Sequence, residues 1–168
     1  MWVLRHAKAA PEGPDDHGRP LTSRGERQAA DLAARIAGGV GPGVVVPTTV
    51  LCSSARRALQ TAELVVPALG ERVELLVERA LYQADPDDVV GRLGELPAET
   101  AAVMVVGHNP TVHDLAGLLL DDGDRRGRAQ LEEGFPPASL AVVALPAGRW
   151  AASPLGTGTL RVLWRPAR

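Results

Sequence analysis

The sequence predicts an α/β sandwich with a mostly parallel central sheet, and two observations support this fold class. Short apolar runs alternate with helical patterns along most of the 168 residues. Hydrophobic residues make up 45% of the chain and aromatic residues only 3%, so the core must consist of leucine, valine and alanine. This composition favours helices packed on both faces of a valine-rich sheet, and the length fits one domain spanning residues 1–168.

Strands are predicted where short apolar runs lie between turn-forming residues. The run at residues 101–106 is apolar throughout, which is typical of a central parallel strand covered on both faces. Two runs near the end of the sequence, joined by a connection that contains proline and glycine, are predicted to close the sheet. The six predicted strands lie at residues 2–8, 49–52, 73–77, 101–106, 138–145 and 159–164.

The first two helices are predicted from capping signals followed by apolar residues at helical spacing. Ser23 and Glu26 have the Ser-x-x-Glu spacing of a capping box, and Thr22 is an alternative cap one residue earlier. Ser53 and Ser54 follow the second strand and can cap the helix after it. We expect these helices to end at Gly38–Gly39 and at Pro67 or Gly70.

Two further helices are predicted in the second half of the chain. Asp85 followed by Pro86 has the pattern of a helix start, and Pro97 ends that helix. Another helix covers residues 111–120, and Asn109 is expected to cap it rather than to orient the neighbouring histidine. The charged residues 121–133 form a loop or a short helix.

Charge and cysteine content exclude several classes of function. A net charge of −2 provides no general attraction for nucleic acid or anionic lipid, and aromatic side chains that stack on bases are scarce. The single cysteine, Cys52, lies in an apolar run, so we interpret it as a buried structural thiol. No apolar run approaches the roughly 20 residues of a membrane helix, and no signal segment opens the chain. We therefore expect a soluble, cytoplasmic protein without a nucleic-acid or membrane partner.

Basic side chains follow three of the predicted strands at the point where each strand ends. Arg5 and His6 end the first, His108 ends the fourth, and Arg56 or Arg57 lies one turn into the helix after the second. The carboxyl ends of parallel strands meet at one edge of a sheet, where the following helices direct their amides. Two imidazoles and two guanidiniums would repel one another unless an anion lay between them, and guanidiniums bind phosphate oxygens in pairs. A phosphoryl group is the natural ligand.

Three motifs in these positions resemble those of the histidine phosphatase superfamily, the phosphoglycerate-mutase-like group. Arg5-His6-Ala7 is similar to its Arg-His-Gly signature, residues 53–62 are similar to its Ser-Pro-x-x-Arg-Ala-x-x-Thr-Ala stretch, and residues 106–110 are similar to its second-histidine loop. The likeness covers most of residues 2–120. Further segments resemble the short branch of this superfamily, the phosphohistidine phosphatases of the SixA type. These segments are Arg19-Pro20-Leu21-Thr22, Leu81-Tyr82 and Phe135-Pro136-Pro137.

The resemblance implies a fold, a mechanism and a set of site residues. The fold is a three-layer, phosphoglycerate-mutase-like α/β/α sandwich. His6 attacks phosphorus and becomes transiently phosphorylated, Arg5 and Arg57 hold the non-bridging oxygens, and His108 completes the clamp. Arg57 is preferred to Arg56 because it directly precedes the alanine of the matching motif. Water then hydrolyses the phosphoenzyme, inorganic phosphate is the product, and neither a metal nor another cofactor is required.

The sequence departs from the family pattern in two places that bear on the substrate. Ala7 replaces the usual glycine, so the backbone there must avoid a conformation open only to glycine. Gln83 lies where larger relatives carry a glutamate as general acid, although Asp85 or Glu78 could replace that acid. A missing acid favours a phosphoramidate, whose imidazole leaves more readily than an alkoxide. The short chain also lacks a long lid, and Arg19 could bind substrate at the mouth of an open site.

The resulting prediction is a metal-independent phosphatase that removes phosphate from phosphohistidine in a signalling or carrier protein. Two alternatives stay open at this point. One is a phosphatase for a small phosphate ester metabolite, with Asp85 or Glu78 as the acid. The other is a non-catalytic module that binds phosphate.

Overall fold

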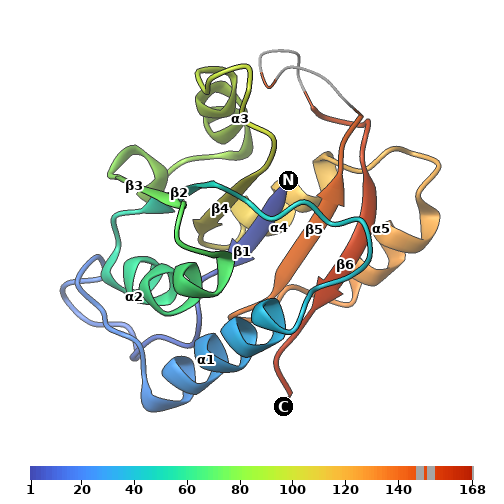
Figure 1. The fold of residues 1–168 in the computed structure, drawn as a ribbon. Coiled ribbons are helices and arrows are strands. Elements are labelled where there is room, and N and C mark those ends of the chain that lie inside the picture. Colours follow the sequence, from blue (N-terminus) through green and yellow to red (C-terminus); the bar gives the residue numbers. More distant parts are fainter. Residues whose placement is uncertain (147–149, 151–153, 168) are drawn as a thin grey trace.

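The computed structural model of the protein describes residues 1–146, 150 and 154–167. Six strands of the described chain form one mixed sheet in the order β3-β2-β4-β1-β5-β6 (Figure 1). The strands are β1 (Trp2–Arg5), β2 (Thr49–Ser53), β3 (Glu74–Glu78), β4 (Val103–Gly107), β5 (Leu140–Ala144) and β6 (Thr159–Trp164). The helices are α1 (Ser23–Ala37), α2 (Arg56–Val65), α3 (Pro86–Gly94), α4 (Thr111–Leu118) and α5 (Arg125–Glu132), with 3₁₀ turns η1 (Val66–Leu69) and η2 (Ala80–Tyr82).

The sheet is parallel over four of its strands. β3, β2, β4 and β1 run in the same direction, whereas β5 is antiparallel to its neighbours β1 and β6. In the parallel part Arg5 pairs with Gly107, so the carboxyl ends of β1 and β4 lie at the same level. β4, between β1 and β2, is buried along its whole length, as its unbroken apolar run predicts.

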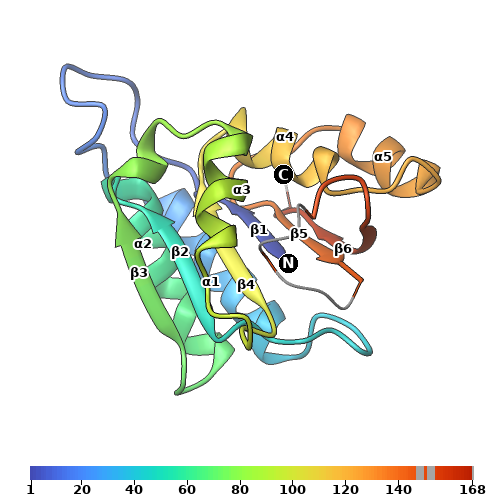
Figure 2. The ribbon, with the colours of Figure 1, turned by 90° about the horizontal axis from the view of Figure 1, so that it is seen from above.

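Helices cover both faces of the sheet, which confirms the predicted three-layer α/β/α fold (Figures 1 and 2). Alternate residues of a strand point to opposite faces. Trp2 and Leu4 of β1 therefore pack against α1 and α2, whereas Val3 packs in the core beneath α3, α4 and α5. Among the described residues, no helix has both the length and the apolar character that crossing a membrane requires.

For helix α1 the structure selects the alternative cap Thr22, so the capping box of Ser23 and Glu26 is wrong. Thr22, not Ser23, is the N-cap, and its hydroxyl accepts a hydrogen bond from the Gly25 amide at 3.1 Å. The reason is tertiary, because the amide and the hydroxyl of Thr22 both donate to the Lys8 carbonyl. This anchor fixes where the chain enters the helix.

The expected serine cap of α2 and asparagine cap of α4 are also wrong. Helix α2 begins after Ala55, and the carbonyl of His17 accepts from the Arg56 amide in place of a side-chain cap. Helix α4 has no side-chain cap, and Asn109 donates instead to the Phe135 carbonyl at 3.1 Å. The predicted cap Asp85 does cap α3, in a full capping box with Asp88. The connection between β5 and β6 lies partly outside the described residues.

Candidate active site

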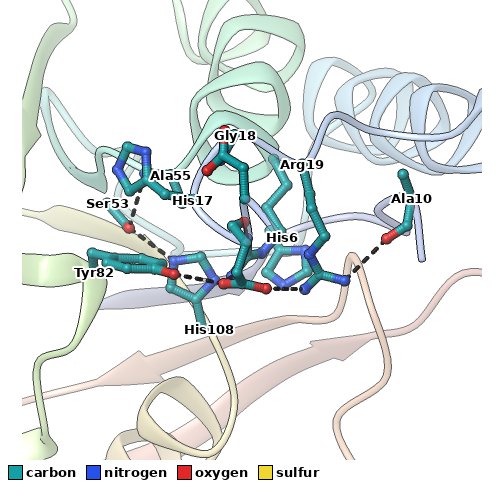
Figure 3. Close-up of polar contacts among 12 residues, drawn as sticks. His6, Ala10, His17, Gly18, Arg19, Ser53, Ala55, Tyr82 and His108 are labelled. Atoms are coloured by element: carbon teal, nitrogen blue, oxygen red, sulfur yellow. Dashed lines mark hydrogen bonds and ion pairs between the residues drawn. The ribbon is translucent and has the colours of Figure 1, made fainter. Parts of the chain in front are cut away.

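The carboxyl ends of β1 and β4 bring two histidines together. His6 directly follows β1, and its amide donates to the Gly107 carbonyl at the end of β4 at 3.0 Å. His108 is the next residue along that strand. The two imidazole centroids are 5.0 Å apart with the rings tilted by 53° (Figure 3). The main-chain ladder therefore sets the spacing of the two rings.

Hydrogen bonds fix the orientation of both rings. The Nδ1 atom of His6 lies 2.7 Å from the Ala7 carbonyl oxygen, and because a carbonyl only accepts, this nitrogen carries the proton. The unprotonated Nε2 of His6 then retains its lone pair for attack on an electrophile. His108 is held by its Nε2 atom, which lies 2.8 Å from the Ser53 hydroxyl at the end of β2. Ser53 therefore orients the second histidine.

Burial keeps both imidazoles neutral at physiological pH. Desolvation is the largest cause and lowers the pKa of His6 to about 4, with the Arg57, Arg5 and Arg19 guanidiniums acting in the same direction. Desolvation, followed by the charge of His6, also lowers the pKa of His108, to about 3. A neutral His6 is nucleophilic, whereas its protonated form is not.

Two guanidiniums predicted from the sequence lie beside the histidines. Arg57 is only 5% exposed, and Arg5 is partly buried and donates to the Phe135 carbonyl at 2.8 Å. Arg56 is exposed to solvent, which agrees with the choice of Arg57. Burial lowers the pKa of the Arg5 guanidinium, although arginine stays charged. The chain thus encloses positive charge at this edge of the sheet.

A carboxylate and a phenol complete the cluster. Tyr82 belongs to a segment that resembles the SixA type, whereas no motif indicated the carboxylate. Asp16, in the loop after β1, accepts from the Tyr82 hydroxyl at 2.6 Å and from Arg57 at 3.1 Å. Its other carboxylate oxygen pairs with Arg19 at 2.8 Å. Figure 3 shows Tyr82, Arg19 and His108 gathered around His6. Arg19, expected to reach the mouth of the site, therefore lies in the cluster, whereas the polar, turn-rich segment of Asp16 did not indicate where that carboxylate would lie.

Several hydrogen-bond donors of this cluster lack a partner within the described residues. They are the buried Nε atoms of Arg5, Arg19 and Arg57, and the Nδ1 atom of His108 is buried and unpaired as well. Buried polar groups are rarely left unsatisfied, and each one costs stability. The cluster also carries two net positive charges, because three guanidiniums are balanced by only one carboxylate and the imidazoles are neutral. An anion with several oxygens would satisfy the donors and balance the charge.

The remaining side chains considered from the sequence have structural partners. Glu78 forms an ion pair with Arg92 at 2.8 Å, and Asp85 caps α3. Gln83 is exposed. Cys52 is fully buried, which raises the pKa of its thiol to about 12 and supports a structural role.

The other two histidines occupy different environments. His113 donates to the Leu131 carbonyl at 3.0 Å and stacks on Phe135 away from the cluster. His17, which no motif singled out, packs edge to face with Tyr82, with the two ring centroids 4.8 Å apart. It also forms a 2.9 Å hydrogen bond with Ser54.

The lowered histidine pKa values predict a pH-dependent loss of stability. Imidazoles of the unfolded chain titrate near ~6.5, whereas those of His6 and His108 titrate at about 4 and about 3 when folded. As pH falls through this window, the unfolded state binds more protons, so the free energy of unfolding must fall. Each imidazole contributes at most about 1.4 kcal/mol per pH unit.

Urea denaturation over this pH range measures the effect. His108→Gln should make the free energy of unfolding depend less steeply on pH below pH ~6.5. The difference in this free energy between wild type and variant at alkaline pH serves as the reference. Parallel curves for wild type and variant would contradict the assignment of the slope to this ring.

An α/β fold with a neutral imidazole and buried donors for an anion of the size of phosphate, at the carboxyl edge of its sheet, is typical of a phosphatase. Residues 1–101 match the family model of the histidine phosphatase superfamily (branch 1), a range that contains His6 and Arg57. The chain belongs to the histidine phosphatase superfamily. It is 35% identical over 152 residues to an uncharacterized protein of Mycobacterium tuberculosis, a match that covers 88% of this chain and 90% of that relative.

Solved structures agree with this membership. The proposed phosphohistidine phosphatase SixA of Nakamurella multipartitia has a TM-score of 0.82 and 27% identity, over 99% of this chain and 95% of that one. The protein histidine phosphatase SixA in complex with tungstate has a TM-score of 0.74 and 29% identity, over 97% of this chain and 96% of that one. The protein is accordingly a phosphatase of SixA-like, phosphoglycerate-mutase-like fold.

Proposed function

We propose that this phosphatase removes phosphate from phosphohistidine in a protein through a covalent intermediate on His6. The observation that carries the proposal is the pairing of the His6 and His108 rings at 5.0 Å, beside buried guanidiniums that have unpartnered donors. The likeness to a SixA that binds tungstate, an oxyanion with the shape of phosphate, gives independent support.

In the first step the Nε2 lone pair of His6 forms a bond to phosphorus while the bond from phosphorus to the leaving nitrogen breaks. Arg5 and Arg57 hold the non-bridging oxygens, whose charge is spread in the transition state. His108, placed by Ser53, contributes a further donor once the anion has bound. A dianion close to the ring favours its protonated form and offsets the desolvation that keeps it neutral in the empty site.

In the second step water attacks phosphorus and the bond to Nε2 of His6 breaks. The electron pair returns to the imidazole, and inorganic phosphate leaves with the oxygen of water. The hydrogen bond from Nδ1 of His6 to the Ala7 carbonyl keeps the same tautomer throughout. The enzyme is thereby restored without a metal or another cofactor.

The leaving group is the point that separates phosphohistidine from a phosphate ester. An alkoxide must be protonated as it leaves, and the two carboxyls considered for that task have other partners. Glu78 is paired with Arg92, and Asp85 closes the capping box of α3. Imidazole leaves more readily than an alkoxide, so the engagement of both carboxyls favours the phosphoramidate.

A substrate comparison tests this choice. We expect hydrolysis of a phosphohistidine protein to exceed hydrolysis of an alkyl phosphate by roughly 100-fold or more in kcat/KM. Glu78→Gln and Asp85→Asn should leave both rates within about twofold of wild type, because neither group donates a proton. If alkyl phosphates were turned over equally well and one of these variants lost that activity, a small ester would be the substrate.

A further inference from the structure

The carboxylate of Asp16 occupies a hydrogen-bond donor, the Arg57 guanidinium, that the proposed function assigns to the phosphoryl group. Its Oδ2 atom accepts from Arg57 at 3.1 Å and from the Tyr82 hydroxyl at 2.6 Å. Its Oδ1 atom pairs with the Arg19 guanidinium at 2.8 Å. A carboxylate and a phosphoryl group accept from a guanidinium with the same fork geometry. They therefore compete for the same donors.

The loop holds this carboxylate in place by its main chain as well as by its charge. The carbonyl of Asp16 accepts from Arg57 at 2.6 Å, and the carbonyl of His17 accepts from the first amide of α2. The base of the loop is closed by a hydrogen bond from the Ala10 amide to the Pro20 carbonyl at 2.8 Å. Arg57 can therefore keep its main-chain partner while the Asp16 side chain turns away to solvent. That side chain is 44% exposed, so the outward path is open.

The carboxylate is ionised under physiological conditions. The hydrogen bond from Tyr82 is the largest cause that lowers the pKa of Asp16, and the charges of Arg57 and Arg19 act in the same direction. A full negative charge therefore lies beside the clamp whenever the site is empty. The Nε atoms of these guanidiniums, which have no partner in the described part of the chain, remain available to a stronger, more highly charged acceptor.

We infer that Asp16 is a specificity-determining residue. Its carboxylate is a resident anion that a phosphoryl group must displace, and it disfavours ligands that carry further negative charge. The inference rests on the proposed function, because it takes Arg57, which Asp16 engages, as part of the clamp that holds the phosphoryl group. The displaced carboxylate stays close to the ligand, so it repels a second anionic group and attracts a cationic one. The substrate class it favours is a phosphoryl group on a neutral or cationic nitrogen base, such as an imidazole that protonates on its free nitrogen.

Phosphate binding to Asp16→Asn measures the competition directly. Isothermal titration calorimetry with inorganic phosphate, at a pH where phosphate is dianionic, should give roughly tenfold tighter binding than wild type. Asp15→Asn is the matched control, since it removes the same charge from the next residue. Asp15 is exposed, accepts from the Gly18 amide and lies outside the cluster. Its phosphate affinity should stay within about twofold of wild type.

A pair of ligands of similar size tests the selectivity. Wild type should bind ethyl phosphate more tightly than phosphoglycolate, which adds a carboxylate, and Asp16→Asn should reduce that preference by roughly tenfold. Tyr82→Phe removes one partner of the Asp16 carboxylate and should move both measurements in the same direction by a smaller factor. This variant keeps the test open if Asp16→Asn is poorly folded.

Equal or weaker phosphate binding by Asp16→Asn, or an unchanged preference between the two ligands, would overturn the inference and make Asp16 a support for Arg57. These measurements need binding and no turnover. Failure of the proposed chemistry would instead be seen as turnover that persists without His6, so the two failures are distinguishable.

Discussion

Replacement of His6 by alanine should abolish turnover and covalent labelling, with a loss of roughly four orders of magnitude or more in kcat. The reason is that alanine removes the only atom proposed to bond to phosphorus, whereas the arginines remain. Incubation with a radiolabelled phosphoramidate, followed by rapid denaturation, should trap label on the wild type that is stable to base and lost in acid. The variant should trap none.

Two controls show that the loss is chemical. His113→Gln removes a histidine that packs on Phe135 outside the cluster, and it should be labelled as wild type is. His6→Ala should still bind inorganic phosphate, because Arg5 and Arg57 remain in place. Turnover by His6→Ala at the wild-type rate would refute the covalent mechanism.

Arg57→Ala should lower kcat/KM by roughly 100- to 1,000-fold, while the neighbouring Arg56→Ala should change it by less than about twofold. The two side chains are adjacent in α2 and carry the same charge, yet Arg57 is 5% exposed in the cluster and Arg56 is open to solvent. The loss combines a missing donor with the release of Asp16, which then lacks one of its cationic partners.

Steady-state kinetics with a phosphoramidate substrate measure both variants. Arg57→Lys keeps the charge but not the planar fork, so it should recover only part of the activity. Equal losses for Arg56→Ala and Arg57→Ala would mean that general positive charge, and not this clamp, binds the substrate.

The sheet was predictable because burial imposes a plain pattern on each strand. β4 is covered on both faces and reads as an unbroken apolar run, and β6 was placed at its observed bounds. The convergence of His6 and His108 also followed from sequence, because the carboxyl ends of parallel strands must share one edge. These inferences depend on local patterns and on a general rule of topology.

The contribution of Asp16 could not be predicted, because it depends on the path of a loop. The segment between β1 and α1 has no periodicity, and its position is set by contacts with residues of α2 and η2 that are distant in the sequence. The capping errors have the same origin. Thr22 caps α1 because Lys8 holds it, and Asn109 is drawn away from α4 by the Phe135 carbonyl. Local propensity cannot choose between neighbouring candidates when tertiary contacts decide.

The hydrogen bond from His6 to Gly107 has a consequence for how the molecule matures. During synthesis the proposed nucleophile leaves the ribosome about a hundred residues before the strand that fixes its distance from the second ring. A truncated chain that stops after β3 would carry His6, Arg5 and Arg57 and still lack a competent centre. We therefore expect phosphatase activity to appear only when β4 pairs with β1, in a single step late in biogenesis.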